Sequence, residues 1–321
     1  MRYRRLGQTD LEVSVLGFGA SPLGNVFSVV DPVEGTRAVH RAIDSGLNFF
    51  DVSPYYGLTL AEQRLGTALV GRRKEVILAT KCGRYGTDDF DFSARTIVDG
   101  VDASLRRLKT DYVDLLQVHD VEFGSVDQIV TETLPALRDL QKAGKTRYVG
   151  ITGYSLETLI ATADLAPVDS ILSYCRYNLM VRDMDQCLTP FAKENGIGLI
   201  NASPLHMGVL SSGEIPTWHP AAPEVWAAGR RAAVICKAHG LRLPEVALRF
   251  CLSEPSVAST LVGMSTVEQL EENLRALEPS DDTNVIREIT TAIGSSLNYV
   301  WPSGIINSVE PSGRVETHDR S

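Results

Sequence analysis

The chain has 321 residues, of which 44% are hydrophobic and 22% charged, a composition typical of a folded globular protein. Its formal net charge of −9 argues against a surface that binds nucleic acid or anionic lipid. We find no cationic start followed by an apolar core, as in a secretory signal, and no stretch typical of a membrane span. The five cysteines form no CxxC pair and are an odd number, so we expect reduced thiols in a cytoplasmic protein, with no metal site indicated.

Short apolar runs recur along the chain and alternate with segments of helical periodicity. Residues 94–108 place Ile97, Val101 and Leu105 four apart, and residues 126–144 repeat leucines before ending in lysine and glycine, so both ranges predict helices. A hairpin is predicted over residues 3–6 and 11–15. Eight further runs are typical of fully buried strands: residues 15–19, 47–51, 76–81, 113–119, 147–152, 170–174, 198–203 and 258–263.

Eight strand–helix units predict a parallel sheet that is covered by helices and closes into a TIM barrel, (β/α)8. The alternative, an open doubly wound sheet, would favour a glycine-rich first turn. The stretch GFGASPLG places Pro22 where the dinucleotide-binding fingerprint needs its third glycine, so that fingerprint is absent. No linker divides the chain. We therefore expect a single domain over residues 1–321, with an N-terminal β-hairpin and an aperiodic tail from about residue 297 that wraps over the barrel mouth.

Ionisable residues stand at the ends of three consecutive predicted strands. Asp51, Lys81 and His119 each follow an almost wholly apolar run. Because active sites of TIM barrels lie at the carboxyl ends of the strands, we expect these side chains to meet there. Taken singly, each would also be ordinary: the aspartate as a turn cap, the lysine as a solvated charge and the histidine as a satisfied core residue.

Tyr56 follows Asp51 through a Ser-Pro turn and would complete an acid–base centre. The pKa of a free tyrosine is about 10, so proton transfer near neutral pH requires a lower value. An ammonium group at Lys81 favours the phenolate, and Asp51 would keep that ammonium charged and in place. His119 could donate a hydrogen bond to the reacting oxygen. This combination predicts interconversion of a carbonyl and an alcohol.

The order and spacing of these motifs resemble the aldo-keto reductase family. The resemblance implies a tetrad of Asp51, Tyr56, Lys81 and His119 on a barrel, with the tyrosine and the histidine also contacting the substrate. Residues 79–94 and 171–178 resemble members that oxidise L-galactose, L-fucose and similar aldoses. The motifs that carry the family resemblance span most of the chain: LGFGASPLG, FFDVSPYYG, ATKCGRY, VDLLQVHD, GITGYS, ASPLHMG and LVGMSTVEQLEENLRAL.

The same resemblance implies a nicotinamide dinucleotide lying extended across the barrel mouth. Many members have a Ser-Asn pair at positions 152–153 and a ring-stacking aromatic at position 202, where this chain has Thr-Gly and Ala202. Stacking of the nicotinamide by Tyr174 is therefore a hypothesis. The cofactor contacts that the resemblance implies are Thr152, Tyr174, Ser203, Leu205, Gly208, Gly263, Ser265, Gln269, Glu272 and Asn273.

We expect the cofactor to be NAD, with NADP disfavoured. The 2′-phosphate of NADP is normally bound by arginine or lysine, and relatives that prefer NADP have basic residues at positions 263 and 269. Residues 257–278 of this chain carry four acidic side chains and one basic one, Arg275. The helix start after Gly263 could still attract a phosphate.

The expected reaction is oxidation of an aldose at C1 by NAD to give a lactone. Trp218, in the long loop after the seventh barrel strand, either stacks on the sugar or packs that loop. The alternatives are an NADPH-dependent reductase of aldehydes or ketones, a dinucleotide-binding regulatory or scaffold subunit, and a Schiff-base aldolase that uses Lys81. The neighbouring Asp51 disfavours the aldolase by keeping the lysine charged. A monomer and a homo-oligomer both stay open.

Overall fold

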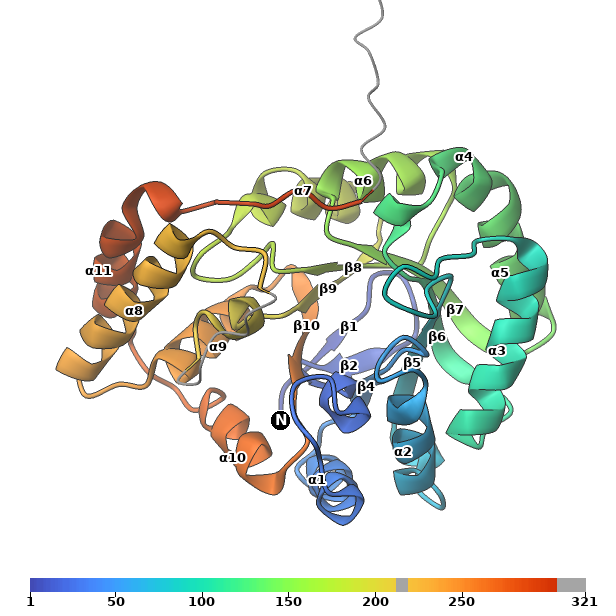
Figure 1. Ribbon diagram of the computed structural model, residues 1–321, viewed down its shortest axis with the longest axis horizontal. Helices are drawn as coiled ribbons and strands as arrows, with labels where there is room; N and C mark the ends of the chain where they lie inside the picture. The colour runs from blue at the N-terminus through green and yellow to red at the C-terminus, as the bar shows by residue number, and fades with distance from the viewer. Residues whose placement is uncertain (212–218, 305–321) are drawn as a thin grey trace, which may run out of the picture.

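The computed structural model describes residues 1–211 and 219–304. Its centre is a closed barrel of eight parallel strands in the order β10-β3-β4-β5-β6-β7-β8-β9, surrounded by helices (Figure 1). The predicted (β/α)8 barrel is therefore confirmed, and each predicted buried run forms one strand. The strands are β3 Leu16–Gly19, β4 Phe49–Asp51, β5 Ile77–Cys82, β6 Val113–Val118, β7 Thr146–Gly153, β8 Ser170–Tyr174, β9 Gly198–Ala202 and β10 Val257–Gly263.

The helices follow the strands in alternation and cover the outer face of the barrel. Helix α3 has the bounds that its leucine and valine spacing predicts. None of the helices in the described ranges is long and apolar enough to cross a membrane. The helices are α1 Pro32–Asp44, α2 Leu60–Ala68, α3 Ala94–Leu108, α4 Val126–Gln128, α5 Leu134–Lys142, α6 Leu156–Leu165, α7 Leu188–Glu194, α8 Pro223–Ala238, α9 Leu243–Ser253, α10 Val267–Arg275 and α11 Thr283–Ile293.

The predicted helix over residues 126–144 is interrupted by a wider, π-helical turn over Ile129–Thr133. The N–H of Leu134 bonds to the carbonyl of Ile129, five residues back. Pro135 has no N–H to give to the carbonyl four residues earlier, so an uninterrupted α-helical ladder cannot form here. The apolar spacing survives this turn, which is why periodicity alone did not detect it.

The predicted hairpin forms from β1 Tyr3–Arg5 and β2 Glu12–Ser14 and closes the amino end of the barrel. Leu6, Leu11 and Val13 pack inside the barrel against residues such as Phe49.

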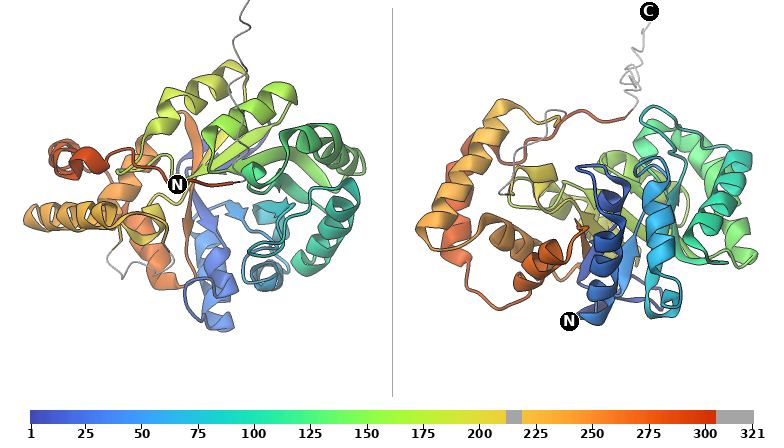
Figure 2. Two further views of the ribbon diagram at one scale, coloured as in Figure 1. Left: turned by 45° about the horizontal axis from the view of Figure 1, so that its top comes forward. Right: turned by 60° about the horizontal axis from the view of Figure 1, so that its bottom comes forward.

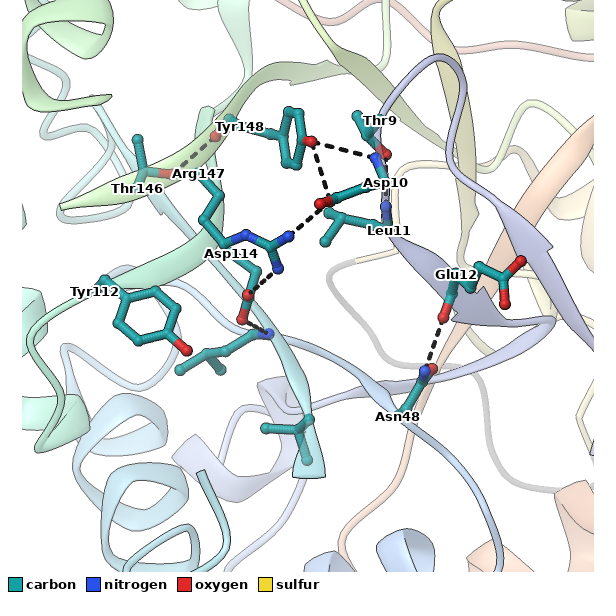
Figure 3. Close-up of polar contacts among 12 residues, drawn as sticks. Thr9, Asp10, Leu11, Glu12, Asn48, Tyr112, Asp114, Thr146, Arg147 and Tyr148 are labelled. Atoms are coloured by element: carbon teal, nitrogen blue, oxygen red, sulfur yellow. Dashed lines mark hydrogen bonds and ion pairs between the residues drawn. The ribbon is translucent and has the colours of Figure 1, made fainter. Parts of the chain in front are cut away.

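Polar contacts fasten the hairpin to the first residues of the barrel strands (Figure 3). Asp10 accepts hydrogen bonds from Arg147 at 2.6 Å and from the Tyr148 hydroxyl at 3.0 Å, and Arg147 also binds Asp114 at 3.0 Å. Because this end is plugged, the carboxyl ends of the strands form the open mouth.

The chain after α11 crosses the mouth side of the barrel, as the red segment in Figure 2 shows. The N–H of Asn298 bonds to the carbonyl of Met180, and Trp301 stacks on Tyr154 with ring centroids 4.8 Å apart. The Ser303 hydroxyl reaches Glu122 at 3.3 Å. We call residues 297–304 the strap. The predicted wrapping of the tail is confirmed for the strap, and residues 305–321 lie outside the described part.

Candidate active site

The four predicted catalytic side chains come from three neighbouring strands and meet at the barrel mouth. Asp51 is the last residue of β4, Lys81 lies one residue before the end of β5, and His119 directly follows β6. Tyr56 lies in the turn after β4, and its ring lies 5.8 Å from that of His119. The structure therefore places together all four residues that the sequence predicts.

Lys81 and Asp51 form a buried ion pair, with residue exposures of 2% and 4%. Lys81 also donates to the carbonyl of Val52 at 3.0 Å, and the second oxygen of Asp51 accepts from Gln117 at 3.1 Å. Burial pulls the pKa of Lys81 down, but Asp51 and Tyr56 outweigh it and raise that pKa above its ordinary value. The lysine is therefore held as an ammonium group in a fixed position.

The Lys81 ammonium group lies 5.0 Å from the centroid of the Tyr56 ring. It pulls the pKa of the Tyr56 hydroxyl down, in the expected direction. Burial has the larger effect, and the pKa of Tyr56 lies above its ordinary value. The prediction of a net lowering is thus wrong, because sequence spacing shows the neighbouring charge but not the loss of water around the hydroxyl. The influence of Lys81 is to bring a high pKa back toward the working range.

His119 is neutral and has a defined tautomer. Burial, followed by the charges of Lys81 and Arg84, holds the pKa of His119 well below its usual range. Its Nδ1 lies 3.0 Å from the Ser53 hydroxyl, whose oxygen already accepts the N–H of Tyr55 at 3.1 Å. Since that hydroxyl can give its own proton to Nδ1, we assign the ring proton to Nε2. Nε2 can then donate to a substrate oxygen.

Ser53 and Gln117 support the site, and our reading of the sequence missed both roles. Gln117 is opposite Lys81 in the register of β5 and β6, and it is the polar residue near the end of the apolar run VDLLQV. Its position in that run was a usable signal. Ser53 gave none, because a serine before a proline is ordinary turn chemistry.

The residues implied for cofactor binding fall into two groups. Leu205, Gly263, Gln269, Glu272 and Asn273 line one cavity of about 180 Å³ beside the ends of β9 and β10. This cavity combines apolar walls with two amides and two carboxylates, polar groups that suit the ribose and adenine of a dinucleotide.

The other group lies along the rim of the mouth. Thr152 and Tyr174 stand at the ends of β7 and β8, and Ser203 and Gly208, both with positive φ, shape the turn after β9. Ser265 donates through both its N–H and its hydroxyl to Gln269, at 2.8 and 3.3 Å. The two groups lie on the same face of the barrel as the tetrad, as a bound dinucleotide requires.

Arg242 is a cation at this cavity that the local sequence count did not include. It comes from the turn before α9 and pairs with Glu272 and, at 3.3 Å, with Glu245. Arg275 binds the same Glu245 at 2.9 Å and lies 3.6 Å from Glu272. Two arginines and two glutamates therefore neutralise one another. Of the four acidic residues in 257–278, only Glu272 belongs to this cluster, and folding adds Arg242 and Glu245 from outside that range.

Trp218 lies outside the described residues. The next residue, His219, is buried, and its Nε2 lies 3.1 Å from the carbonyl of His206. The edge of the His219 ring lies near Trp301 of the strap, with ring centroids 5.6 Å apart. His219 therefore packs this loop against the strap.

Glu122 fixes the other end of the strap and should make stability depend on pH. Burial, followed by the charge of Asp120, raises the pKa of Glu122 from 4.5 to about 7. Between these values the folded protein keeps this proton and the unfolded chain releases it, so the free energy of unfolding falls as pH rises. The free energy of unfolding of the wild-type protein should therefore fall by about 2–3 kcal/mol between pH 4.5 and 7. Glu122→Gln stays neutral at both pH values and should not show this fall. Urea unfolding at both pH values checks this, and parallel pH profiles for the two proteins would contradict it.

A parallel barrel whose mouth holds a charged lysine, a tyrosine and a neutral histidine defines an acid–base site for carbonyl chemistry. The sequence profile of the Aldo/keto reductase family matches residues 15–293, and the chain belongs to this family. It is accordingly an oxidoreductase, and family membership implies a nicotinamide dinucleotide as cofactor.

Two curated relatives and one solved structure show which members this chain is similar to. It is 46% identical to L-galactose dehydrogenase of Arabidopsis thaliana, over 94% of this chain and 97% of that protein. It is 30% identical to D-threo-aldose 1-dehydrogenase of a Pseudomonas species, over 82% and 89% of the two chains. The holo form of an aldo-keto reductase from Bacillus halodurans superposes with a TM-score of 0.77 at 30% identity, covering 93% of this chain and 98% of that chain.

Proposed function

We propose that this protein is an NAD-dependent aldose 1-dehydrogenase that oxidises L-galactose, L-fucose or an aldose of similar stereochemistry to the aldonolactone. The observation that carries the proposal is the 46% identity to an L-galactose dehydrogenase over nearly the full length of both chains. The intact site of Asp51, Tyr56, Lys81 and His119 supplies the chemistry that such a reaction needs.

Each of the four side chains has its own role in this reaction. Nε2–H of His119 holds the oxygen on C1 of the sugar, and Tyr56, as phenolate, accepts the proton of that hydroxyl. Lys81 stabilises the phenolate, and Asp51 keeps Lys81 charged and in place. The bound nicotinamide supplies the acceptor for the hydride that leaves C1. Loss of the proton and the hydride leaves a C1 carbonyl, which is the lactone.

The burial of Lys81 disfavours the aldolase alternative. A Schiff base needs a free amine that can reach a carbonyl, whereas Lys81 is 2% exposed and paired with Asp51. The reductase alternative uses the same residues in the opposite direction. A spectrophotometric screen of aldoses with NAD and NADP, beside reduction of simple aldehydes with NADH and NADPH, separates these functions. Faster reduction of simple aldehydes than oxidation of any aldose would replace the dehydrogenase with a reductase.

For the cofactor, we infer a preference for NAD of at least about tenfold in kcat/KM, which corresponds to ~1.4 kcal/mol. The support is the pairing of Arg242, which lines the cavity, with Glu272, and of the adjoining Arg275 with Glu245. A 2′-phosphate would have to displace a carboxylate to reach an arginine and would meet its negative charge, whereas ribose hydroxyls can donate to that carboxylate.

This inference makes Glu272→Gln the informative change, because it removes the shorter of the two ion pairs of Arg242 and leaves only the 3.3 Å contact with Glu245 to compete with a phosphate. We expect kcat/KM with NADP to rise about tenfold or more and kcat/KM with NAD to fall slightly. Glu271→Gln is the matched control: it is the neighbouring glutamate on α10, and it pairs at 2.8 Å with Arg41 instead. Gln269 is a poorer site for the test because it binds Ser265. Equal effects of the two substitutions on the NADP/NAD ratio would contradict the inference.

A further inference from the structure

Arg84, in the loop after β5, joins three loops of the barrel mouth. Its guanidinium group lies 3.8 Å from the centroid of the Tyr55 ring, which belongs to the loop after β4. It also lies 4.9 Å from the ring of Phe90 in its own loop and 5.7 Å from that of Phe123, after β6. The rings of Phe90 and Phe123 stack on each other at 4.6 Å. The guanidinium group is therefore fixed by aromatic rings rather than free in solvent.

The partner of Arg84 is Asp120, which stands directly beside the reacting centre. One carboxylate oxygen of Asp120 lies 2.5 Å from Arg84 and 3.7 Å from Nε2 of His119. Asp120 is 2% exposed and has φ +52°, and its N–H donates to Thr152 at 3.1 Å. The other oxygen, Oδ1, accepts no hydrogen bond from residues in the described ranges.

The buried charge of Asp120 requires a cationic partner, which is Arg84. Aspartate tolerates a positive φ, and Arg84 engages only one of its two carboxylate oxygens. None of the four tetrad residues uses the other oxygen. The carboxylate that carries it lies beside the one ring nitrogen, Nε2 of His119, that can hold the reacting oxygen of a substrate, with Oδ2 3.7 Å from that nitrogen.

We propose that Asp120, positioned by Arg84, accepts a hydrogen bond from the hydroxyl on C2 of the sugar and so selects substrates with a hydroxyl next to the reacting carbon. The proposal rests on the function proposed above. Oxygens on adjacent carbons of a sugar lie about one hydrogen-bond length apart, so an oxygen bound at Nε2 brings its neighbour within reach of Asp120. Arg84 is a positioning residue: burial raises the pKa of Asp120, and Arg84 fixes the carboxylate and opposes that rise, which favours a charge-assisted hydrogen bond.

Asp120→Asn tests this assignment with little risk to folding, since asparagine also accepts a positive φ. Arg84 requires an acceptor, so the amide oxygen should face Arg84 and the amide NH₂ should take the place of Oδ1. We expect the ratio of kcat/KM for L-galactose to that for 2-deoxy-L-galactose to fall about tenfold or more, mainly through the loss with L-galactose. Equal losses with the two sugars, or an unchanged ratio, would overturn the proposal.

Arg84→Met should lower the same ratio, and Arg84→Lys should recover part of it, because lysine restores the charge but not the stacking. The matched control is Asp183→Asn. It breaks a comparable pair with Arg176, whose guanidinium group lies 4.8 Å from the Tyr154 ring, and it leaves His119 untouched. That control should leave the ratio unchanged.

A second pair of substrates separates this proposal from the proposed function. If the wild-type protein oxidises no aldose, the dehydrogenase function fails, and reduction of glyceraldehyde and 3-hydroxypropanal replaces the sugar pair. These aldehydes differ only in the hydroxyl on C2. A preference for glyceraldehyde that is lost in Asp120→Asn would support the role of Asp120 on its own, and a preference that persists in that variant would overturn it.

Discussion

Replacing Tyr56 with phenylalanine should lower kcat by ~10²–10⁴-fold, the range typical of a general acid–base group. In the proposed reaction the Tyr56 phenolate takes the proton from the substrate, and no other described tyrosine is so close to both Lys81 and His119. The substitution removes one oxygen and keeps the ring, so dinucleotide binding should change little. Steady-state kinetics, with fluorescence titration of the cofactor, measure both effects.

Tyr85→Phe is the control for this change. Tyr85 lies in the loop after β5, and its hydroxyl donates to the Thr96 carbonyl at 3.3 Å rather than to any residue of the tetrad. We expect that variant to keep a kcat close to that of the wild-type protein. A loss below about tenfold in Tyr56→Phe would show that another group carries the proton.

Lys81→Met should also depress kcat and should move the pH profile of aldose oxidation upward. The ammonium group lowers the pKa of Tyr56 against the effect of burial, so its removal leaves a hydroxyl that ionises only at higher pH. Oxidation requires the phenolate, and its rising limb should shift in the same direction. Initial rates measured across pH, with saturating NAD, report this shift.

The control for Lys81→Met must deal with Asp51, which would otherwise be left as a buried unpaired charge. The double variant Asp51→Asn/Lys81→Met removes both charges and keeps an amide for Gln117 to contact. We expect it to unfold less readily than Lys81→Met while showing the same upward shift. A wild-type pH profile in both variants would refute the role of Lys81 in tuning Tyr56.

The fold follows from the sequence because buried parallel strands read as continuous apolar runs, and such runs occur eight times. The same property makes Asp51, Lys81 and His119 conspicuous: each ends a run that otherwise has almost no ionisable residue. Predicting that they meet at the mouth required only the rule that the carboxyl ends of barrel strands lie together around the active site.

Other features depend on contacts that spacing cannot show. Arg242, before α9, forms an ion pair with Glu272 of α10, and Arg84, after β5, forms one with Asp120, after β6. The pKa of Tyr56 depends on desolvation, which is a property of the packed mouth and not of a motif. Pro135 can be seen in the sequence. Packing decides whether the helix continues past this proline through a wider turn or ends before it.

The central claim, removal of hydride from C1 of an aldose, is tested most directly with L-galactose that carries deuterium at C1. Incubation with the protein and NAD should transfer the deuterium to C4 of the nicotinamide and yield a lactone that hydrolyses to the acid, both detectable by NMR. Tyr56→Phe should slow this transfer by the factor given above. Deuterium retained in the sugar product, or appearing in water instead of in the nicotinamide, would contradict the account.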